Sequence, residues 1–226
     1  MYANPIKTRI IAIDGPAGSG KSTVAREVAK RIRFIYLDTG AMYRALTLKA
    51  LRKKIKLEDE EVLVDLARTT DIDIKSLSDG KLLVFLDKED VTNLIRTSSV
   101  TNSVSFIARV PNVREVMVDL QRKFGRNNNI VVEGRDIGTV VFPDAEKKIY
   151  LDADFKERAR RRFKELKEVD DSVNEEETQN DLSERDNKDL TRKVAPLKKA
   201  EDAIYLDTTN LTIEEVVSKI VKIING

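Results

Sequence analysis

The chain has 226 residues, a length that fits one α/β domain with insertions or two small domains. Its 41 lysines and arginines nearly balance 39 aspartates and glutamates, so the net charge of +2 gives no whole-protein argument for nucleic-acid binding. The absence of cysteine excludes disulfides and thiolate metal sites, and the absence of histidine excludes serine–histidine hydrolysis. We expect a cytoplasmic protein without a signal peptide or a membrane span, because no apolar stretch is long enough.

A glycine-rich segment begins the series of expected elements. Residues 15–22 read Gly-Pro-Ala-Gly-Ser-Gly-Lys-Ser, the G-x-x-x-x-G-K-S pattern of a phosphate-binding loop, and they follow the apolar run 10–13. In such a loop the backbone N–H groups surround the phosphates, and the N-terminus of the next helix, expected at 22–32, faces the anion. Lys21 adds positive charge at the β- and γ-phosphates, and the Ser22 hydroxyl is a ligand for Mg²⁺. The pattern predicts a triphosphate site; the alternative is a glycine-rich turn before a helix.

Five short apolar runs predict buried parallel strands, and helical stretches separate them. Four of the runs end in aspartate and one in glutamate, at the edge where open α/β sheets bind ligands. The alternation predicts an α/β fold of three layers with a five-stranded parallel sheet. The expected strands are 9–14, 34–38, 130–133, 148–152 and 203–207, and the expected helices are 22–32, 41–54, 111–125, 154–167 and 212–224.

One stretch interrupts this alternation. Residues 70–74, 82–86 and 90–91 alternate in polarity like an antiparallel ribbon, with a turn at 78–80. They indicate an insertion of about thirty residues in the parallel domain. A second irregular stretch, 168–181, is acidic and poor in apolar residues, and we expect a mobile loop or a helix end there.

Two segments that follow predicted strands combine glycine with charged side chains. In 37–44 an Asp-Thr-Gly sequence ends a strand and Arg44 follows one turn into a helix, an arrangement that suits an acceptor phosphate. In 132–144 two glycines flank Arg135 and Asp136 directly after a buried strand. The position at a strand's carboxyl end favours a ligand site, and the alternative is a surface ion pair that contributes little.

A further segment places charges on one helical face. Arg185, Asp189 and Arg192 are spaced i, i+4 and i+7, so they share a face if the segment is helical. Taken alone, this pattern is more typical of a solvated face with salt bridges.

An arginine cluster lies on the expected helix 154–167. Arg158, Arg161 and Arg162 share one face of it. Three interpretations of this face are open: an RNA-binding patch, a solvated helix face, or a set of arginines that close over a triphosphate. Since no aromatic residue interleaves with them, the RNA interpretation is weaker.

Taken together, these motifs are similar to those of bacterial cytidylate kinases, which are P-loop nucleoside monophosphate kinases. The resemblance runs nearly from end to end. The strings GRD-x-GTVVFPDA and RD-x-x-D-x-x-R are far more specific than the phosphate-loop pattern. The resemblance rests on IDGPAGSGKST (13–23), YLDTGAMYR (36–44), VPNVRE (110–115), VEGRDIGTVVFPDA (132–145), RDNKDLTR (185–192) and VAPLKKAEDA (194–203).

The resemblance implies transfer of the γ-phosphoryl group of ATP to CMP or dCMP in pyrimidine nucleotide metabolism, by a monomer that needs neither nucleic acid nor a membrane. It implies a P-loop fold with an inserted antiparallel monophosphate-binding domain and a short helical lid. The expected division of this single domain is a core of 1–62, 100–153 and 193–226, an insertion of about 63–99 and a lid of about 154–192.

The resemblance also implies the roles of individual residues. The catalytic group comprises Lys21, Arg135, Arg158 and Arg161. ATP is bound by Gly15, Pro16, Ala17, Gly18, Ser19, Gly20, Lys21, Ser22, Thr23 and Arg162, and we expect the lid arginines to reach the triphosphate only when the lid closes.

On the acceptor side, the resemblance assigns residues to each part of CMP. Arg44, Arg135 and Arg192 bind the phosphate, Ser105, Arg114 and Asp136 the cytosine, and Arg185 and Asp189 the ribose, with Thr39 lining the pocket. A carboxylate suits cytosine because it accepts from the 4-amino group, whereas uracil presents a carbonyl there.

The expected cofactor is Mg²⁺, bound with ATP through Ser22 and, by way of water, Asp38. The sequence leaves open whether Asp14 or Asp38 orients the magnesium's water shell.

Three rival functions share some of these features. A GTPase would need an Asn-Lys-x-Asp string after a strand, and in 187–190 a leucine occupies the aspartate position. A shikimate- or gluconate-type kinase shares fold and size but does not need the charged face of 185–192. A nucleotide-binding scaffold or RNA-binding module would use only the arginine cluster.

Overall fold

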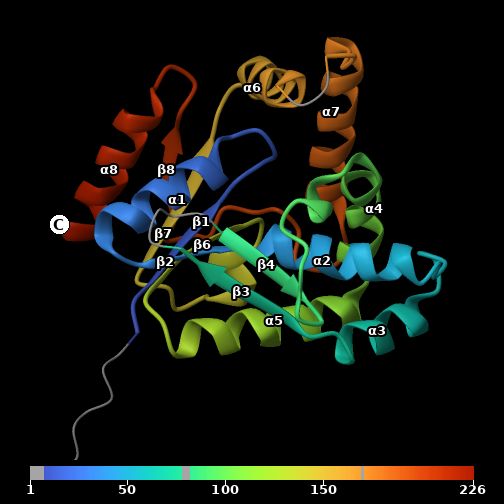
Figure 1. Cartoon of the computed structure of the whole chain (residues 1–226). Coiled ribbons are helices and arrows are strands. Elements are labelled where there is room, and N and C mark those ends of the chain that lie inside the picture. The colour runs from blue at the N-terminus through green and yellow to red at the C-terminus, as the bar shows by residue number, and fades with distance from the viewer. Residues whose placement is uncertain (1–7, 78–81, 169–170) are drawn as a thin grey trace, which may run out of the picture.

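The computed structural model describes residues 8–77, 82–168 and 171–226, so the turn expected at 78–80 lies outside the described residues. A parallel sheet of five strands forms the centre of the molecule, in the order β2-β6-β1-β7-β8 (Figure 1). All five predicted strands are confirmed, each end within one residue of its expected position. The strands are β1 (Ile10–Asp14), β2 (Ile35–Asp38), β6 (Ile130–Gly134), β7 (Lys147–Asp152) and β8 (Ile204–Asp207).

Helices cover both faces of this sheet because the connections from β1 to β2 and from β2 to β6 run in opposite directions across it. The chain passes from β1 to β2 through α1, and it returns from β2 to β6 through a path that includes α2 and α5. Right-handed crossovers place these two paths on opposite faces, and α8 packs beside α1. Burial on both sides explains the apolar strands, in which Ile11, Ile13 and Val131 are fully buried. These helices are α1 (Lys21–Ile32), α2 (Thr39–Arg52), α5 (Pro111–Arg126) and α8 (Ile213–Asn225).

The strand register gathers carboxylates at one edge of the sheet. Asp38 at the end of β2 pairs with Glu133 of β6, and Asp14 at the end of β1 pairs with Gly134. The parallel strands therefore deliver their terminal acidic residues to the same edge, as predicted.

The ribbon predicted between β2 and β6 is a separate antiparallel sheet, β3-β4-β5. Its strands are β3 (Ile72–Ser76), β4 (Leu82–Leu86) and β5 (Glu89–Asp90), and β4 turns its buried residues towards α2. Two helices beside it were not predicted, α3 (Glu60–Arg68) and α4 (Ser98–Ala108). The α4 sequence is rich in serine, threonine and valine, which favour helix weakly, so its packing against α2 stabilises it.

The C-terminal third contains α6 (Phe155–Lys167) and α7 (Glu175–Thr191), which pack together (Figure 1). The acidic stretch expected as a loop or helix end contains the start of α7. The Asn174 side chain accepts a hydrogen bond from the Glu177 N–H at 3.1 Å, and the glutamates of the first turn are favoured by the helix dipole. Of the helices described, none has the length and apolar character to cross a membrane.

Candidate active site

The glycine-rich loop turns tightly between β1 and α1, as predicted. Gly18 has a φ of +73°, in the left-handed region that favours glycine. At Gly15 a Cβ atom would lie 1.9 Å from the backbone oxygen of Leu151, so the loop passes too close to β7 for any side chain. Lys21 is only 5% exposed, and its Nζ donates to the Pro16 carbonyl oxygen at 2.6 Å. The lysine side chain therefore folds back over the loop, where phosphates bind in this kind of structure.

The Lys21 ammonium lies among charged groups of the other motifs. Burial lowers the pKa of Lys21 to about 7, and the positive charge of Arg135 acts in the same direction. Glu133 opposes this by raising the pKa, Arg185 lowers it, and Asp189 raises it. The glycine-rich loop, the segment after β6 and helix α7 thus meet at one place.

Asp14 holds the loop that follows β6. Its two carboxylate oxygens accept hydrogen bonds from the backbone N–H groups of Ile137 at 2.8 Å and Gly138 at 2.7 Å. These residues begin the π-helical turn Ile137–Val141 (η2). Burial raises the pKa of Asp14 to about 6, although the two hydrogen bonds lower it. Because backbone groups engage both oxygens, Asp14 is less suited than Asp38 to orient water.

We expect Asp14→Asn to alter the pH dependence of stability. The folded pKa of about 6 exceeds the ordinary value of 3.8, so the folded wild type holds the extra proton and loses stability as the pH rises through this interval. The shift corresponds to about 3 kcal/mol. Since asparagine does not titrate, the free energy of unfolding of the variant minus that of wild type should increase by up to about 3 kcal/mol between about pH 4 and pH 7. Urea denaturation at several pH values measures it, and parallel curves would contradict the raised pKa.

Glu133, at the end of β6, is a candidate that the sequence reasoning named only as a strand-end carboxylate. It is 5% exposed, and the Tyr36 hydroxyl donates to its Oε1 at 2.9 Å. Burial raises the pKa of Glu133, and the negative charge of Asp38 adds to the rise. A hydrogen bond with Ser22 lowers the pKa, which places the Ser22 hydroxyl beside this carboxylate.

Asp38 divides its oxygens between a helix cap and the site. Its Oδ1 accepts from the Ala41 N–H at 2.9 Å, and its Oδ2 lies 3.9 Å from Nη2 of Arg96. Within residues 8–77, 82–168 and 171–226, no group of three or more His, Cys, Asp or Glu residues could hold a metal alone. Two carboxylates and one hydroxyl nevertheless fit Mg²⁺, which usually binds one or two carboxylates together with substrate phosphates and water.

Three predicted arginines converge from different elements. Arg135 donates through Nε to Asp189 Oδ2 at 2.8 Å, and Arg44 donates through Nη1 to the Thr101 hydroxyl at 2.7 Å. Burial lowers the pKa of Arg185 to about 10, and the charges of Arg135 and Arg44 lower it further. The mutual effect shows that these guanidinium groups lie close together, and such a cluster favours an anion.

Asp136 lies in a second part of the site, between two other arginines. Arg114 donates through Nη2 to Asp136 Oδ2, and Arg192 Nη2 lies 3.5 Å from Asp136 Oδ1. The Arg114 guanidinium also lies 5.6 Å from the centre of the Tyr43 ring. Arg114 Nε and the Tyr43 hydroxyl are buried and make no hydrogen bond within the described part of the chain. A polar ligand here would give these two groups hydrogen-bond partners.

The alternative of a surface Arg135–Asp136 ion pair is wrong. Asp136 is 6% exposed and pairs with Arg114, whereas Arg135 pairs with Asp189. Thr39 is also buried, and its hydroxyl donates to the Glu133 carbonyl at 2.8 Å, so it joins the start of α2 to β6. Ser105 is half-buried on α4, one turn before the end of that helix.

The arginines of α6 are engaged by protein groups in three different ways. Arg158 donates to the Ala17 carbonyl at 2.9 Å and also pairs with Asp186. Arg161 donates to the Thr208 hydroxyl at 3.0 Å and to its carbonyl at 2.7 Å. Arg162 is half-buried and forms an ion pair with the exposed Glu165. Arg158 thus contacts the backbone of the glycine-rich loop in this structure. That the lid arginines reach the triphosphate only when the lid closes stays a prediction.

Comparison with known proteins gives a consistent family. The family model described as "Cytidylate kinase" matches residues 11–226. A cytidylate kinase of Geobacillus sp. (strain WCH70) is 53% identical over 215 residues, which cover 95% of this chain and 96% of that protein. One of Caldanaerobacter subterraneus subsp. tengcongensis is 52% identical, covering 93% of this chain and 92% of the relative.

A solved structure supports the fold at a much lower identity. An uncharacterized protein from Eubacterium ventriosum ATCC 27560 has a TM-score of 0.53 at 14% identity, covering 97% of this chain and 99% of its own. At this identity the likeness concerns the fold alone.

Proposed function

The chain belongs to the cytidylate kinase family, and we propose that it transfers the γ-phosphoryl group of ATP to CMP or dCMP, giving ADP and CDP or dCDP. The observation that carries the proposal is the meeting of Lys21 with Arg135 and Arg185, which places a triphosphate loop beside a cluster of arginines. Donor and acceptor phosphates would be neutralised at one point.

On the donor side, we propose that backbone N–H groups of residues 15–23 surround the phosphates of ATP and that Lys21 contacts the γ-phosphoryl group. Bound with ATP, Mg²⁺ would supply charge neutralisation at the β- and γ-phosphates. Ser22 is the candidate ligand, and Asp38 and Glu133 are the carboxylates beside it that would hold its water. Thr208 and Arg161 lie next to the loop and would contact the rest of the nucleotide.

On the acceptor side, Arg44, Arg135 and Arg192 would bind the phosphate of CMP. An oxygen of that phosphate attacks the γ-phosphorus, the bond to the bridging oxygen of ATP breaks, and the electron pair leaves with ADP. The attacking oxygen is already largely deprotonated at neutral pH, because the second pKa of a phosphate monoester is about 6. The reaction therefore needs positioning and charge neutralisation more than a general base, which suits a chain without histidine.

The cytosine would lie in the part of the site around Asp136. Its 4-amino group would donate to the Asp136 carboxylate, while Arg114 and Ser105 would donate to its acceptors. The Tyr43 hydroxyl and Arg114 Nε, which make no hydrogen bond to the residues that the structure describes, support a polar ligand there. Arg185 and Asp189 lie on the last two turns of α7 and would bind the ribose hydroxyls.

A coupled assay of ADP release tests the proposal directly. We expect rapid release with CMP and dCMP, slower release with UMP, and little with AMP, shikimate or no acceptor. If release with CMP is no faster than with shikimate or without acceptor, the proposal fails. Salt-dependent RNA binding, measured in parallel, tests the binding-module alternative.

We expect Arg161→Ala to lower kcat more than it weakens CMP binding. Arg161 Nη1 is 3.9 Å from the position of a Cβ at Gly20, so its guanidinium lies beside the phosphate loop. The Arg161 side chain is also far less exposed than that of Arg160. Arg160→Ala is the matched control, because Arg160 forms an exposed ion pair with the same Glu157. Steady-state kinetics and calorimetric CMP titration separate the two effects. Equal behaviour of the two variants would remove Arg161 from the ATP site.

We also propose that the protein is a cytoplasmic monomer, as the family resemblance implies. Sedimentation equilibrium at micromolar concentration tests the oligomeric state. A dimer at that concentration would contradict it.

A further inference from the structure

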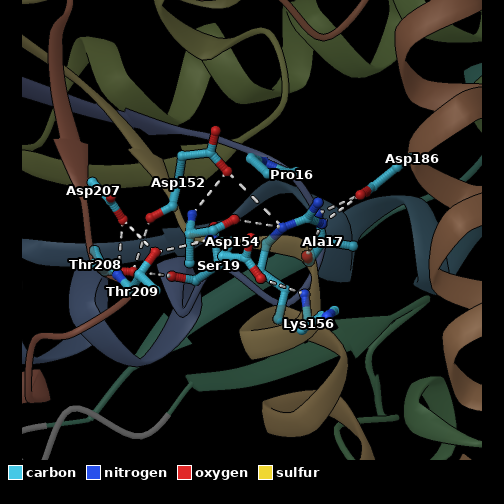
Figure 2. Close-up of polar contacts among 12 residues, drawn as sticks. Pro16, Ala17, Ser19, Asp152, Asp154, Lys156, Asp186, Asp207, Thr208 and Thr209 are labelled. Carbon is cyan, nitrogen blue, oxygen red and sulfur yellow. Dashed lines mark hydrogen bonds and ion pairs between the residues drawn. The ribbon is translucent and has the colours of Figure 1, made fainter.

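The peptide of Ala17, in the middle of the glycine-rich loop, is held on both sides by the two lid helices. Its N–H donates to Asp186 Oδ1 of α7 at 3.1 Å (Figure 2). Its carbonyl accepts from Arg158 Nη1 of α6 at 2.9 Å. Arg158 and Asp186 also pair with each other, and both are 8% exposed. One buried acidic side chain and one buried arginine thus bind the two backbone groups of a single loop residue and link α6 to α7.

Apolar contacts reinforce this arrangement. Ala17, Ala159 of α6 and Leu182 of α7 form a small buried cluster of their own, separate from the main core. Beside it, a Cβ at Gly18 would lie 2.8 Å from the backbone oxygen of Arg158, so the loop packs directly on the α6 backbone. The loop tip therefore packs against both α6 and α7.

Arg158 is itself fixed to the end of β7. Its Nε donates to the Ala153 carbonyl at 3.0 Å and lies 3.9 Å from Asp152 Oδ1. Because the parallel sheet holds this end of the strand, Arg158 presents a rigid guanidinium to Asp186. The position of α7 against the loop is thus set by a group anchored in the sheet.

The helix α7 also carries the acceptor-side residues. Arg185 directly precedes Asp186, and Asp189 follows it by less than one turn and binds Arg135. A helix transmits position rigidly over so short a span, about 1.5 Å per residue along its axis. Arg185 and Asp189 would contact the acceptor from one turn of α7. Asp186 joins this same turn to the phosphate loop.

A gain in folding stability does not by itself explain the presence of the buried Arg158–Asp186 ion pair. Taking two charges out of water costs more than most buried ion pairs return, and apolar replacements of such pairs are often neutral or stabilising. Arg158 and Asp186 instead supply directional hydrogen bonds to a loop that must hold phosphates. Their geometry specifies where the loop lies relative to α7.

We propose that Asp186 is a positioning residue, which through Ala17 and Arg158 fixes the position of helix α7 relative to the phosphate loop. It thereby makes the binding of ATP and CMP mutually favourable. The proposal rests on the proposed function for its substrates. Occupation of Arg185 and Asp189 by the acceptor orders α7, and the ordered helix holds the loop in the shape that receives the triphosphate. By linkage, ATP must then strengthen CMP binding by the same factor.

The first test needs no substrate. Asp186→Asn keeps an oxygen for the Ala17 N–H but loses the charge that pairs with Arg158, so hydrogen exchange in residues 15–23 should become at least about tenfold faster. Asp181→Asn is the matched control, because Asp181 is an exposed carboxylate on the same helix. Unchanged exchange in the Asp186 variant, or equal acceleration in both variants, overturns the proposal.

The second test measures the coupling. In wild type, a non-hydrolysable ATP analogue should lower the calorimetric Kd of CMP at least about fivefold. In Asp186→Asn this factor should fall to near one and kcat should drop by about tenfold or more, while the Kd of CMP alone changes less than about twofold. Asp186→Glu, which keeps the carboxylate, should restore part of both. Absence of the factor in wild type, or its survival in Asp186→Asn, overturns the proposal.

A second variant covers the case in which Asp186→Asn does not fold. Arg158→Lys keeps the positive charge but cannot bind Asp186, Ala17 and Ala153 together, and it should reduce the coupling in the same way. If wild type releases no ADP with CMP, the proposed function fails, while the exchange of residues 15–23 still decides whether Asp186 positions the loop.

Discussion

Lys21→Ala is expected to phosphorylate CMP with a kcat about 100- to 1,000-fold below that of wild type. Lys21 is the buried cation of the glycine-rich loop, and its Nζ is held 2.6 Å from the Pro16 carbonyl. Negative charge grows on the bridging oxygen of ADP as its bond to the γ-phosphorus breaks, so the loss of this cation costs more in the transition state than in the ground state. We therefore expect kcat and kcat/KM for ATP to fall together, measured by coupled ADP release.

We expect Lys21→Ala to fold, because the charged Lys21 side chain does not stabilise the folded state by its burial. That burial is unfavourable for the ammonium group and lowers the pKa of Lys21 to about 7. Thermal unfolding monitored by circular dichroism checks this. Lys30→Ala removes an exposed lysine from the same helix and should leave kcat unchanged. A kcat near wild type in Lys21→Ala would exclude Lys21 from phosphoryl transfer.

The parallel sheet could be predicted from the sequence because each strand is a continuous apolar run buried on both faces. The strand ends were correct to within one residue since each run stops at a carboxylate. The helix α4 was not predicted, because its serine, threonine and valine residues carry little helical signal and tertiary packing determines its structure. The same holds for the π-helical turn η2, whose first N–H group, that of Ile137, binds the Asp14 carboxylate 123 positions earlier in the chain.

The charged residues of the site were also found by motif, but their partners were not. Helical spacing placed Arg185, Asp189 and Arg192 on one face, and the sequence alone favoured a solvated face. In the structure Asp189 binds Arg135, 54 positions earlier. Such pairs depend on which ends of distant elements meet, and periodicity along one helix carries no information about that.

The arginines of the candidate site are not interchangeable. Arg135 is neutralised by Asp189, with which it forms a hydrogen bond. Burial is the largest cause that lowers the pKa of both Arg44 and Arg192, although Asp38 opposes it at Arg44 and Asp136 opposes it at Arg192. The surroundings of these two groups therefore work against their positive charge, and an incoming anion would offset that effect.

Base choice is expected to change most on replacement of Asp136. Asp136→Ala should lose about 2–4 kcal/mol of transition-state stabilisation with CMP, because the cytosine amino group loses a charged acceptor. The structure adds a second consequence, since Arg114 and Arg192 both lie against this carboxylate and would be left without it. A moderate loss with UMP as well is therefore expected from Asp136→Ala, from displacement of the two arginines.

Asp136→Asn separates these contributions. Its amide oxygen still accepts from Arg114, while its NH₂ group opposes the amino group of cytosine and can donate to the 4-carbonyl of uracil. The kcat/KM with CMP should fall by about 30- to 1,000-fold, whereas that with UMP should stay level or rise, so the CMP/UMP ratio collapses. Asp119→Asn, an exposed carboxylate on α5, is the control and should leave the ratio as in wild type. Equal losses with both substrates in Asp136→Asn would mean that Asp136 only holds Arg114 and Arg192 in place, and that the base is read elsewhere.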